Sequence, residues 1–183
     1  MAETNLTYLL VDGENIDGVL GGILNHKPEP GQRPRWLQLL EFAEQKWSQP
    51  VRGLFFINAT RGIPGPFVQA LIGMGFQPIP LSGRADEKVV DIGIQRTLAA
   101  IAERSGDVVL ASHDADFVDG MSAVAAAGRR VGVMAFSELI GHALLDVPGL
   151  EVFDLETTVR AFEVDLPRLR IIPLDEFDPV RYL

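Results

Sequence analysis

Carboxylates at three separated places in this chain could together hold a divalent cation. Asp12 lies in LLVDGEN, Asp91 in KVVDIGI, and Asp114 and Asp116 in LASHDADF. Two of these places follow apolar runs typical of buried strands, where an unpaired carboxylate is costly. Four acids in one cleft repel one another unless a cation lies among them. The sequence therefore predicts a Mg²⁺ or Mn²⁺ site, and such sites most often act on phosphate.

Polar and basic residues next to these acids suggest how the site is completed. The Asn15 amide or the Ser112 hydroxyl could hold a water on the metal or a neighbouring carboxylate, although Asn15 could also cap a helix. Lys88 precedes Asp91 by three residues on the same helix face, so it could pair with that acid or contact a phosphate. We expect His113 to be a solvent-facing turn residue whose pKa is raised by the nearby acids.

Each acid also has a purely structural interpretation. Asp12 precedes a glycine, and Asp-Gly is a common turn signal. Asp116 could cap or begin a helix, and Asp91 could be a solvated helix charge. Asp91 is flanked by Val90 and Ile92, however, which makes a solvated position less natural. The four acids together favour a functional site.

Strand-like apolar runs alternate with helical patterns along the chain. The predicted strands are residues 8–11, 52–57, 77–81, 107–111, 130–135 and 151–154. The predicted helices are residues 16–24, 34–47, 66–74, 87–103, 117–127 and a shorter one at 137–144. This alternation predicts an α/β fold with a mainly parallel central sheet and helices on both faces.

A parallel sheet would bring the acids together. Ligands of such sheets bind in the crevice at the carboxyl ends of the strands. Asp12 follows the first predicted strand, Asp114 and Asp116 follow the fourth, and Asp91 lies in the first turns of the fourth helix. If the first and fourth strands are neighbours, all four acids line one crevice.

The composition predicts one soluble domain. The chain has 183 residues, 47% of them hydrophobic, and it has no cysteine, which excludes disulfides, zinc–thiolate sites and thiol nucleophiles. Its first residues do not resemble a signal peptide, and no apolar run reaches the ~18 residues of a membrane span. We therefore expect a cytoplasmic protein that contacts no membrane. The net charge of −9 argues against a broad nucleic-acid-coating face but not against a metal-dependent nuclease.

The segment at 164–183 breaks the alternation. Its three prolines and clustered acids predict an extended arm that lies on the domain or on a partner chain. Apolar residues in the arm could pack on a second copy, giving a homodimer, or cover the chain's own sheet edge. These residues are Leu169, Ile171, Ile172 and Leu174.

The motifs VDGEN, KVVDIGI and SHDADF, in this order, resemble those of the NYN domain, a family of the PIN-like nuclease superfamily, and are similar to its limkain-type branch. The resemblance covers roughly residues 6–155. It implies a three-layer α/β/α sandwich of PIN-like, Rossmann-like type in residues 1–160, followed by the arm at 161–183. It also implies a divalent-metal site and ribonuclease activity.

The resemblance assigns roles to individual residues. Asp12 matches the first acid of the family, Asp91 the middle acid, and Asp114 and Asp116 the paired acids, so all four would be ligands of Mg²⁺ or Mn²⁺. Asn15, Ser112 and Lys88 match the polar, serine and basic positions beside them. His113 stands where the family pattern usually has glycine, and Asp86 and Glu87 add negative charge beside the entrance.

Single-stranded RNA is the expected substrate, because a narrow acidic cleft admits one backbone more easily than a duplex. Lys88, Arg84 and Arg61 are the basic residues that we expect to contact it. Further basic residues are Lys27, Arg33 and Arg35 in the proline-rich loop at 25–34 and beside it. No aromatic platform for stacking bases is evident from the sequence.

Two other interpretations stay open. A Toprim-type site uses a glutamate after one strand and an Asp-x-Asp pair after another, which Glu14 with Asp114 and Asp116 could supply. It gives Asp91 no role, so the NYN-like interpretation explains more. The chain could also be an RNA- or protein-binding regulatory module of the same fold with little turnover, which the net charge favours.

Overall fold

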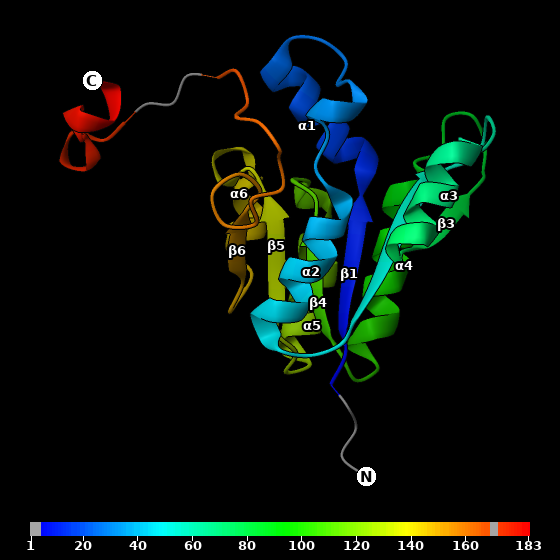
Figure 1. Ribbon diagram of the computed structural model, residues 1–183. Coiled ribbons are helices and arrows are strands. Elements are labelled where there is room, and N and C mark those ends of the chain that lie inside the picture. Colours follow the sequence, from blue (N-terminus) through cyan, green and yellow to red (C-terminus); the bar gives the residue numbers. More distant parts are fainter. Residues whose placement is uncertain (1–4, 169–171) are drawn as a thin grey trace.

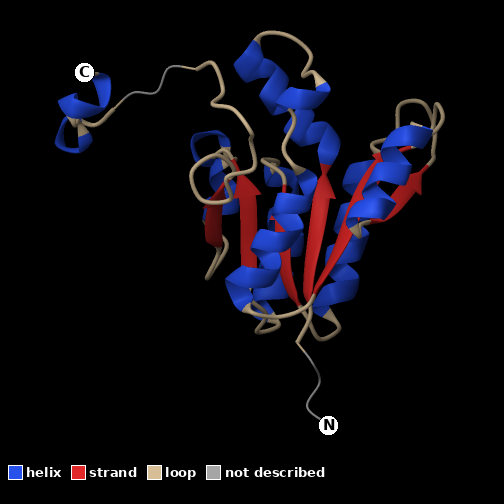
Figure 2. Ribbon diagram, in the orientation of Figure 1, coloured by secondary structure: helices blue, strands red, loops and turns tan. Residues whose placement is uncertain are grey.

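The computed structural model describes residues 5–168 and 172–183. Six strands form one sheet in the order β3-β2-β1-β4-β5-β6, and every neighbouring pair is parallel. The strands are β1 (Thr7–Asp12), β2 (Val51–Asn58), β3 (Gln77–Leu81), β4 (Asp107–Ala111), β5 (Val131–Ala135) and β6 (Glu151–Asp154). The predicted parallel sheet is confirmed (Figure 2). Each predicted strand lies within one residue of its observed bounds.

Helices connect the strands. They are α1 (Gly13–Leu24), α2 (Trp36–Trp47), α3 (Gly65–Met74), α4 (Val89–Ala102), α5 (Val118–Ala126) and the short α6 (His142–Leu145). The single helix predicted at 137–144 is wrong. A 3-10 turn at Ser137–Leu139 precedes α6, and between them Ile140 is extended and buried. The backbone N–H of Gly141 donates to the carbonyl of His113, which ties the chain down where the helix would continue.

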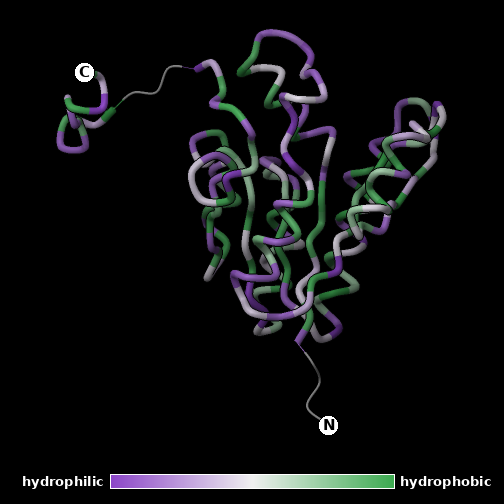
Figure 3. Tube along the Cα trace, viewed as in Figure 1, coloured by the Kyte–Doolittle hydropathy of each residue, from purple (hydrophilic) through white to green (hydrophobic). Residues whose placement is uncertain are grey.

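The helices cover both faces of the sheet, so the molecule is a three-layer α/β/α sandwich (Figure 1). Leu9 and Val11 of β1 belong to one core with α1, α2 and α3. Leu10, between them, belongs to the other core with α4, α5 and α6. Because both faces of the central strands β1, β4 and β5 are covered, their sequences are largely apolar without alternation, whereas the edge strands β3 and β6 keep exposed residues. Figure 3 shows hydrophobic residues along the strands and along the helix faces packed on them.

The strand order places a topological switch point between β1 and β4. The chain builds β2 and β3 on one side of β1 and then returns through α4 to place β4 on the other side. Val11 pairs with Ala111, so the carboxyl ends of β1 and β4 lie side by side. This confirms the predicted neighbourhood, and it creates the crevice in which such sheets bind ligands.

The segment after β6 packs on the face that carries α1, α2 and α3. Ala161 and Leu166 are buried in that core. The backbone N–H of Arg35 donates to the carbonyl of Ala161 at 2.7 Å. The guanidinium of Arg168 pairs with Glu138 and Glu156 and lies over the ring of Phe136, 5.2 Å from its centroid. The first part of the predicted arm therefore lies on its own domain.

The last described segment, 172–183, contains two 3-10 turns, Leu174–Glu176 and Pro179–Tyr182. Ile172 and Leu174 are exposed in the single chain, so they do not cover the sheet edge. Leu169 and Ile171, the other apolar residues of the arm prediction, lie outside the described residues. Of the helices in the described part of the chain, none combines the length and apolar character that crossing a bilayer requires.

Candidate metal centre

Three of the four predicted acids meet at the switch point. Asp91, in the first turn of α4, and Asp114 and Asp116, in the loop after β4, each offer one carboxylate oxygen, and these oxygens all lie within 4.8 Å of one another. Asp91 and Asp114 are half-buried and Asp116 is exposed. A set made only of carboxylate oxygens fits a hard divalent cation such as Mg²⁺ or Mn²⁺.

A chain of hydrogen bonds fixes the loop after β4. The hydroxyl of Ser112 donates to Asp12 Oδ2 at 3.0 Å and accepts the backbone N–H of Asp114 at 3.2 Å. Asp114 Oδ1 in turn accepts the backbone N–H of Asp116 at 2.9 Å, which caps a short 3-10 turn. The sequence interpretation gave Ser112 a role at a carboxylate, and the structure shows that carboxylate to be Asp12.

Asp12 lies beside the three acids but not among them. Its side chain is 2% exposed, and its Oδ1 accepts the backbone N–H of Asn15 at 3.3 Å while Oδ2 accepts Ser112. The pKa of Asp12 is raised to about 6, chiefly by burial and to a smaller extent by the charges of Asp91 and Asp114, against the lowering effect of the two hydrogen bonds. Its role as a direct fourth ligand stays a prediction, and its observed contacts support the loop that carries Asp114.

The pKa of Asp91 also reflects the other acids close to it. Burial raises the pKa of Asp91, the ammonium of Lys88 lowers it, and the charges of Asp114 and Asp116 raise it. Lys88 Nζ lies 3.6 Å from Asp91 Oδ2, so the predicted pairing is present. Glu14 belongs to the same neighbourhood, because its pKa is raised by burial and then by the charge of Asp91.

His113 does not face solvent, and its pKa is not raised. The residue is buried, and burial lowers its pKa to about 4, against a smaller opposing effect of the Glu138 charge. Nε2 accepts the backbone N–H of Phe136 at 2.8 Å, and Nδ1 lies 2.9 Å from Asn15 Oδ1. The neutral ring therefore carries its proton on Nδ1 and donates it to Asn15. A proton on Nε2 would point at the backbone N–H of Phe136, and this hydrogen bond would be lost.

Asn15 holds the histidine loop rather than a carboxylate. Its side-chain oxygen accepts both the ring and the backbone N–H of His113, each at 2.9 Å. It is not the cap of α1 either, because Asp12 occupies that position. Asn15 and His113 thus join the start of α1 to the loop after β4, which sets the two halves of the crevice relative to each other.

The other predicted basic residues lie at the same edge of the sheet but farther along it. Arg61 is exposed in the loop after β2, and Arg84 is exposed in the loop after β3. Arg84 Nε lies 3.8 Å from Asp86 Oδ1. The two residues follow β2 and β3, which lie on the side of β1 away from β4. Their contact with substrate stays a prediction.

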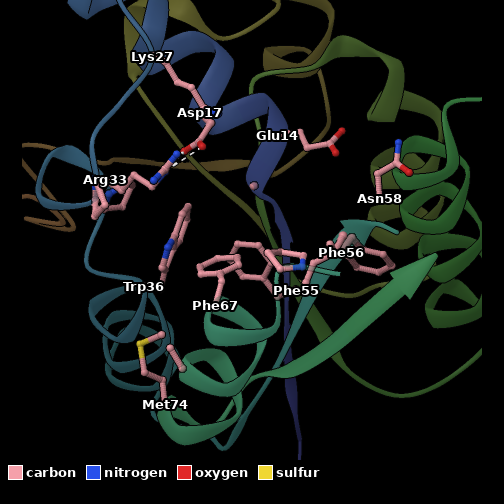
Figure 4. Close-up of a pocket in the computed structure, with 16 residues that line it drawn as sticks. Glu14, Asp17, Lys27, Arg33, Trp36, Phe55, Phe56, Asn58, Phe67 and Met74 are labelled. Carbon is pink, nitrogen blue, oxygen red and sulfur yellow. Dashed lines mark hydrogen bonds and ion pairs between the residues drawn. The ribbon is translucent and has the colours of Figure 1, made fainter. Parts of the chain in front are cut away.

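The sequence interpretation missed an aromatic-lined pocket next to α1. It has a volume of about 740 Å³, and its lining includes Trp36, Phe55 and Phe67 together with Glu14 at the start of α1 (Figure 4). The three rings come from α2, β2 and α3, so their spacing in the sequence does not predict that they lie together. The lining includes none of Asp91, Asp114 and Asp116, so the expectation that the chain has no aromatic platform for stacking bases stays a prediction.

Comparisons with known proteins establish the fold alone. No family model matches the chain, and a search of curated proteins finds no match. Among solved structures, the chain is similar to the crystal structure of VPA0982, a protein of unknown function from Vibrio parahaemolyticus. The TM-score is 0.67 at 20% sequence identity, and the match covers 86% of this chain and 97% of that one. The likeness supports the three-layer α/β/α architecture.

Proposed function

We propose that this chain is a divalent-metal-dependent ribonuclease that hydrolyses phosphodiester bonds of single-stranded RNA, in the manner of the NYN domain that its motifs resemble. One observation carries the proposal. Carboxylates drawn from two elements far apart in sequence, Asp91 on one side and Asp114 and Asp116 on the other, converge within 4.8 Å at the switch point of a parallel sheet. The same three residues stand in the motifs that carry the resemblance.

The residues have distinct tasks in this proposal. Asp91, Asp114 and Asp116 would hold Mg²⁺ or Mn²⁺, with Asp12 beside them. A cation bound there supplies Lewis acidity, which lowers the pKa of an attacking water and neutralises charge on the phosphate. Lys88, whose side chain is 73% exposed, is free to turn its ammonium from Asp91 to a backbone phosphate. Asp12 keeps the backbone of Asp114 in place through the Ser112 hydroxyl.

Cleavage of a labelled single-stranded RNA in the presence of manganese tests the proposal. We expect the wild type to cleave the RNA and EDTA to stop the cleavage. Asp91→Asn and Asp114→Asn should each reduce the cleavage rate by roughly a hundredfold or more, because each removes a group that stabilises charge in the transition state. Asp119→Asn is the matched control, because Asp119 is an exposed acid in the first turn of α5 outside the cluster. Equal cleavage by all variants would indicate a contaminant and refute the proposal.

A Toprim-type site is the second candidate, because Glu14 lies near the acid cluster, where burial and then the charge of Asp91 raise its pKa. The two proposals differ in which acid after β1 matters. If Glu14→Gln abolishes cleavage while Asp12→Asn spares it, the Toprim-type site is correct. The NYN-like proposal expects the reverse order, because Asp12 supports the loop that carries Asp114.

A further inference from the structure

The pocket beside α1 has a rigid aromatic base, in which Trp36 and Phe55 are buried core residues and Phe67 is half-buried. Trp36 meets Phe55 nearly at a right angle, with ring centroids 5.0 Å apart and an interplanar angle of 88°. Phe67 meets the other side of Phe55 in the same way, at 5.4 Å and 82°. The three rings therefore brace one another. Figure 4 shows them together at the bottom of the pocket, with Met74 below.

Positive charge lines one side of the pocket. Lys27 and Arg33 belong to the proline-rich loop after α1 and both line the cavity. Arg33 is anchored by Asp17, whose two carboxylate oxygens accept its Nε–H at 3.0 and 2.9 Å. This bond uses Nε, so the terminal nitrogens of the guanidinium can meet a further acceptor. The pocket thus combines apolar rings with one anchored cation, Arg33, and one exposed cation, Lys27, which suits a group that is flat and aromatic at one end and anionic at the other.

The opposite side of the pocket adjoins the metal centre. Glu14 and Asn58 lie there, across from Lys27 and Arg33 (Figure 4). Glu14 lies two residues after Asp12 in the chain. Asp12 is joined through the Ser112 hydroxyl to the backbone of Asp114, so this side of the pocket lies next to the acid cluster. A chain whose phosphate lies at the three acids would therefore pass this opening with its next nucleotide.

We propose that the pocket receives one unstacked base of single-stranded RNA, next to the phosphate at the acid cluster, while Lys27 and Arg33 contact the adjoining backbone; this inference rests on the proposed ribonuclease function. A volume of about 740 Å³ lies within the range of pockets that enclose small ligands. It admits one nucleotide and excludes a base-paired duplex. Of the three rings, Phe67 is the half-buried one, so a base would stack on Phe67. Aromatic side chains bind bases of any sequence by stacking, so the pocket would place the strand rather than read its sequence.

RNA binding measured by fluorescence anisotropy tests this inference independently of turnover. The probe is a short labelled oligouridylate in calcium, checked by gel to stay intact. Ala70→Trp fills the pocket from an exposed position of α3 without removing any core group. We expect it to weaken binding about tenfold, the effect of one lost base stack. Gln69→Trp, on the same helix but outside the lining, is the matched control and should bind like the wild type.

A second measurement needs no variant of the pocket. A single abasic nucleotide is moved along the RNA, and one position should weaken binding to the wild type about tenfold. The same abasic position should have little further effect on Ala70→Trp, because the stack is already lost. Lys27→Gln should reduce the slope of log affinity against log salt concentration by about 0.7, the value for one lost phosphate contact on a single strand. Arg52→Gln, at the far end of β2, should leave that slope unchanged.

The outcomes separate the two proposals. If no abasic position and no filled pocket changes RNA affinity, while cleavage still depends on Asp114, the base pocket is refuted and the ribonuclease stands. If Ala70→Trp weakens binding but no Asp114-dependent cleavage is found, the ribonuclease is refuted and the pocket is an RNA-binding site. If the wild type binds no RNA, both are refuted.

Discussion

Replacing Asp114 by asparagine removes one of three crowded negative charges and keeps its local hydrogen bond. The amide oxygen of asparagine can still accept the backbone N–H of Asp116. Two unit charges 4.8 Å apart repel by about 1 kcal/mol in water and about 3 kcal/mol near a protein surface. Because Asp116 is exposed, the lower value applies. Relief from both Asp91 and Asp116 should therefore stabilise the metal-free protein by about 2 kcal/mol, or about 4 to 8 °C in Tm.

The response to metal should change in the opposite direction. A cation at a hundred times its Kd stabilises the wild type by about 2.7 kcal/mol. The variant has lost one of three ligands and should show almost none of this gain. Thermal melting with EDTA and with manganese gives both values for the wild type and for Asp114→Asn. Asp119→Asn makes the same chemical change at an exposed position and should behave like the wild type.

Both expected results follow from the same claim, that Asp114 is one of three crowded carboxylates that bind a metal. The opposite of either result would refute this claim. A lower Tm of metal-free Asp114→Asn would show that the carboxylate stabilises the fold and is not repelled. An unchanged manganese response in the variant would show that the ion, if bound, is held elsewhere.

Three further predictions concern the supporting residues. Folding raises the pKa of Asp12 from 3.8 to about 6, so Asp12 adds to the stability of the folded state as the pH falls through 6. Folding lowers the pKa of His113 from 6.5 to about 4, so His113 reduces that stability as the pH falls below 6.5. Each effect is about 3 kcal/mol, so the two nearly cancel in the wild type. Asp12→Asn removes the first effect, so the free energy of unfolding of this variant, measured with urea, should fall between pH 6.5 and pH 4. The same dependence of this free energy on pH in the variant and the wild type would contradict this prediction. Ser112→Ala leaves an oxygen of buried Asp12 without its donor and should cost about 1 to 3 kcal/mol and weaken the manganese response. Arg168→Ala should cost about 2 kcal/mol, whereas Arg181→Ala, whose ion pair is exposed, should cost almost nothing in the same denaturation assay.

Much of the fold could be predicted because short sequence patterns indicate its strands and helices. The unbroken run of Leu9, Leu10 and Val11 has no alternation, which is what a strand covered on both faces requires. Similar runs in β4 and β5, together with three further strand-like segments and the helices between them, left few possible topologies. The convergence of Asp91 with Asp114 then followed from strand order, since the carboxyl ends of neighbouring parallel strands share one edge.

The environment of His113 could not be predicted, because its partners are far away in sequence. Asp114 and Asp116, next to His113 in the chain, suggested an exposed, easily protonated ring. In the structure Asn15 and Phe136, 98 and 23 residues away, occupy its two nitrogens and keep it neutral. The aromatic pocket escaped prediction for the same reason, since Trp36 and Phe67 meet only through Phe55 on another element.

A crystal structure of the protein soaked in manganese tests the central claim most directly. We expect one anomalous-scattering peak bound by oxygens of Asp91, Asp114 and Asp116, with Asp12 next to it. The absence of a peak there, with the three carboxylates turned away from one another, would contradict a shared metal site and with it the proposed chemistry.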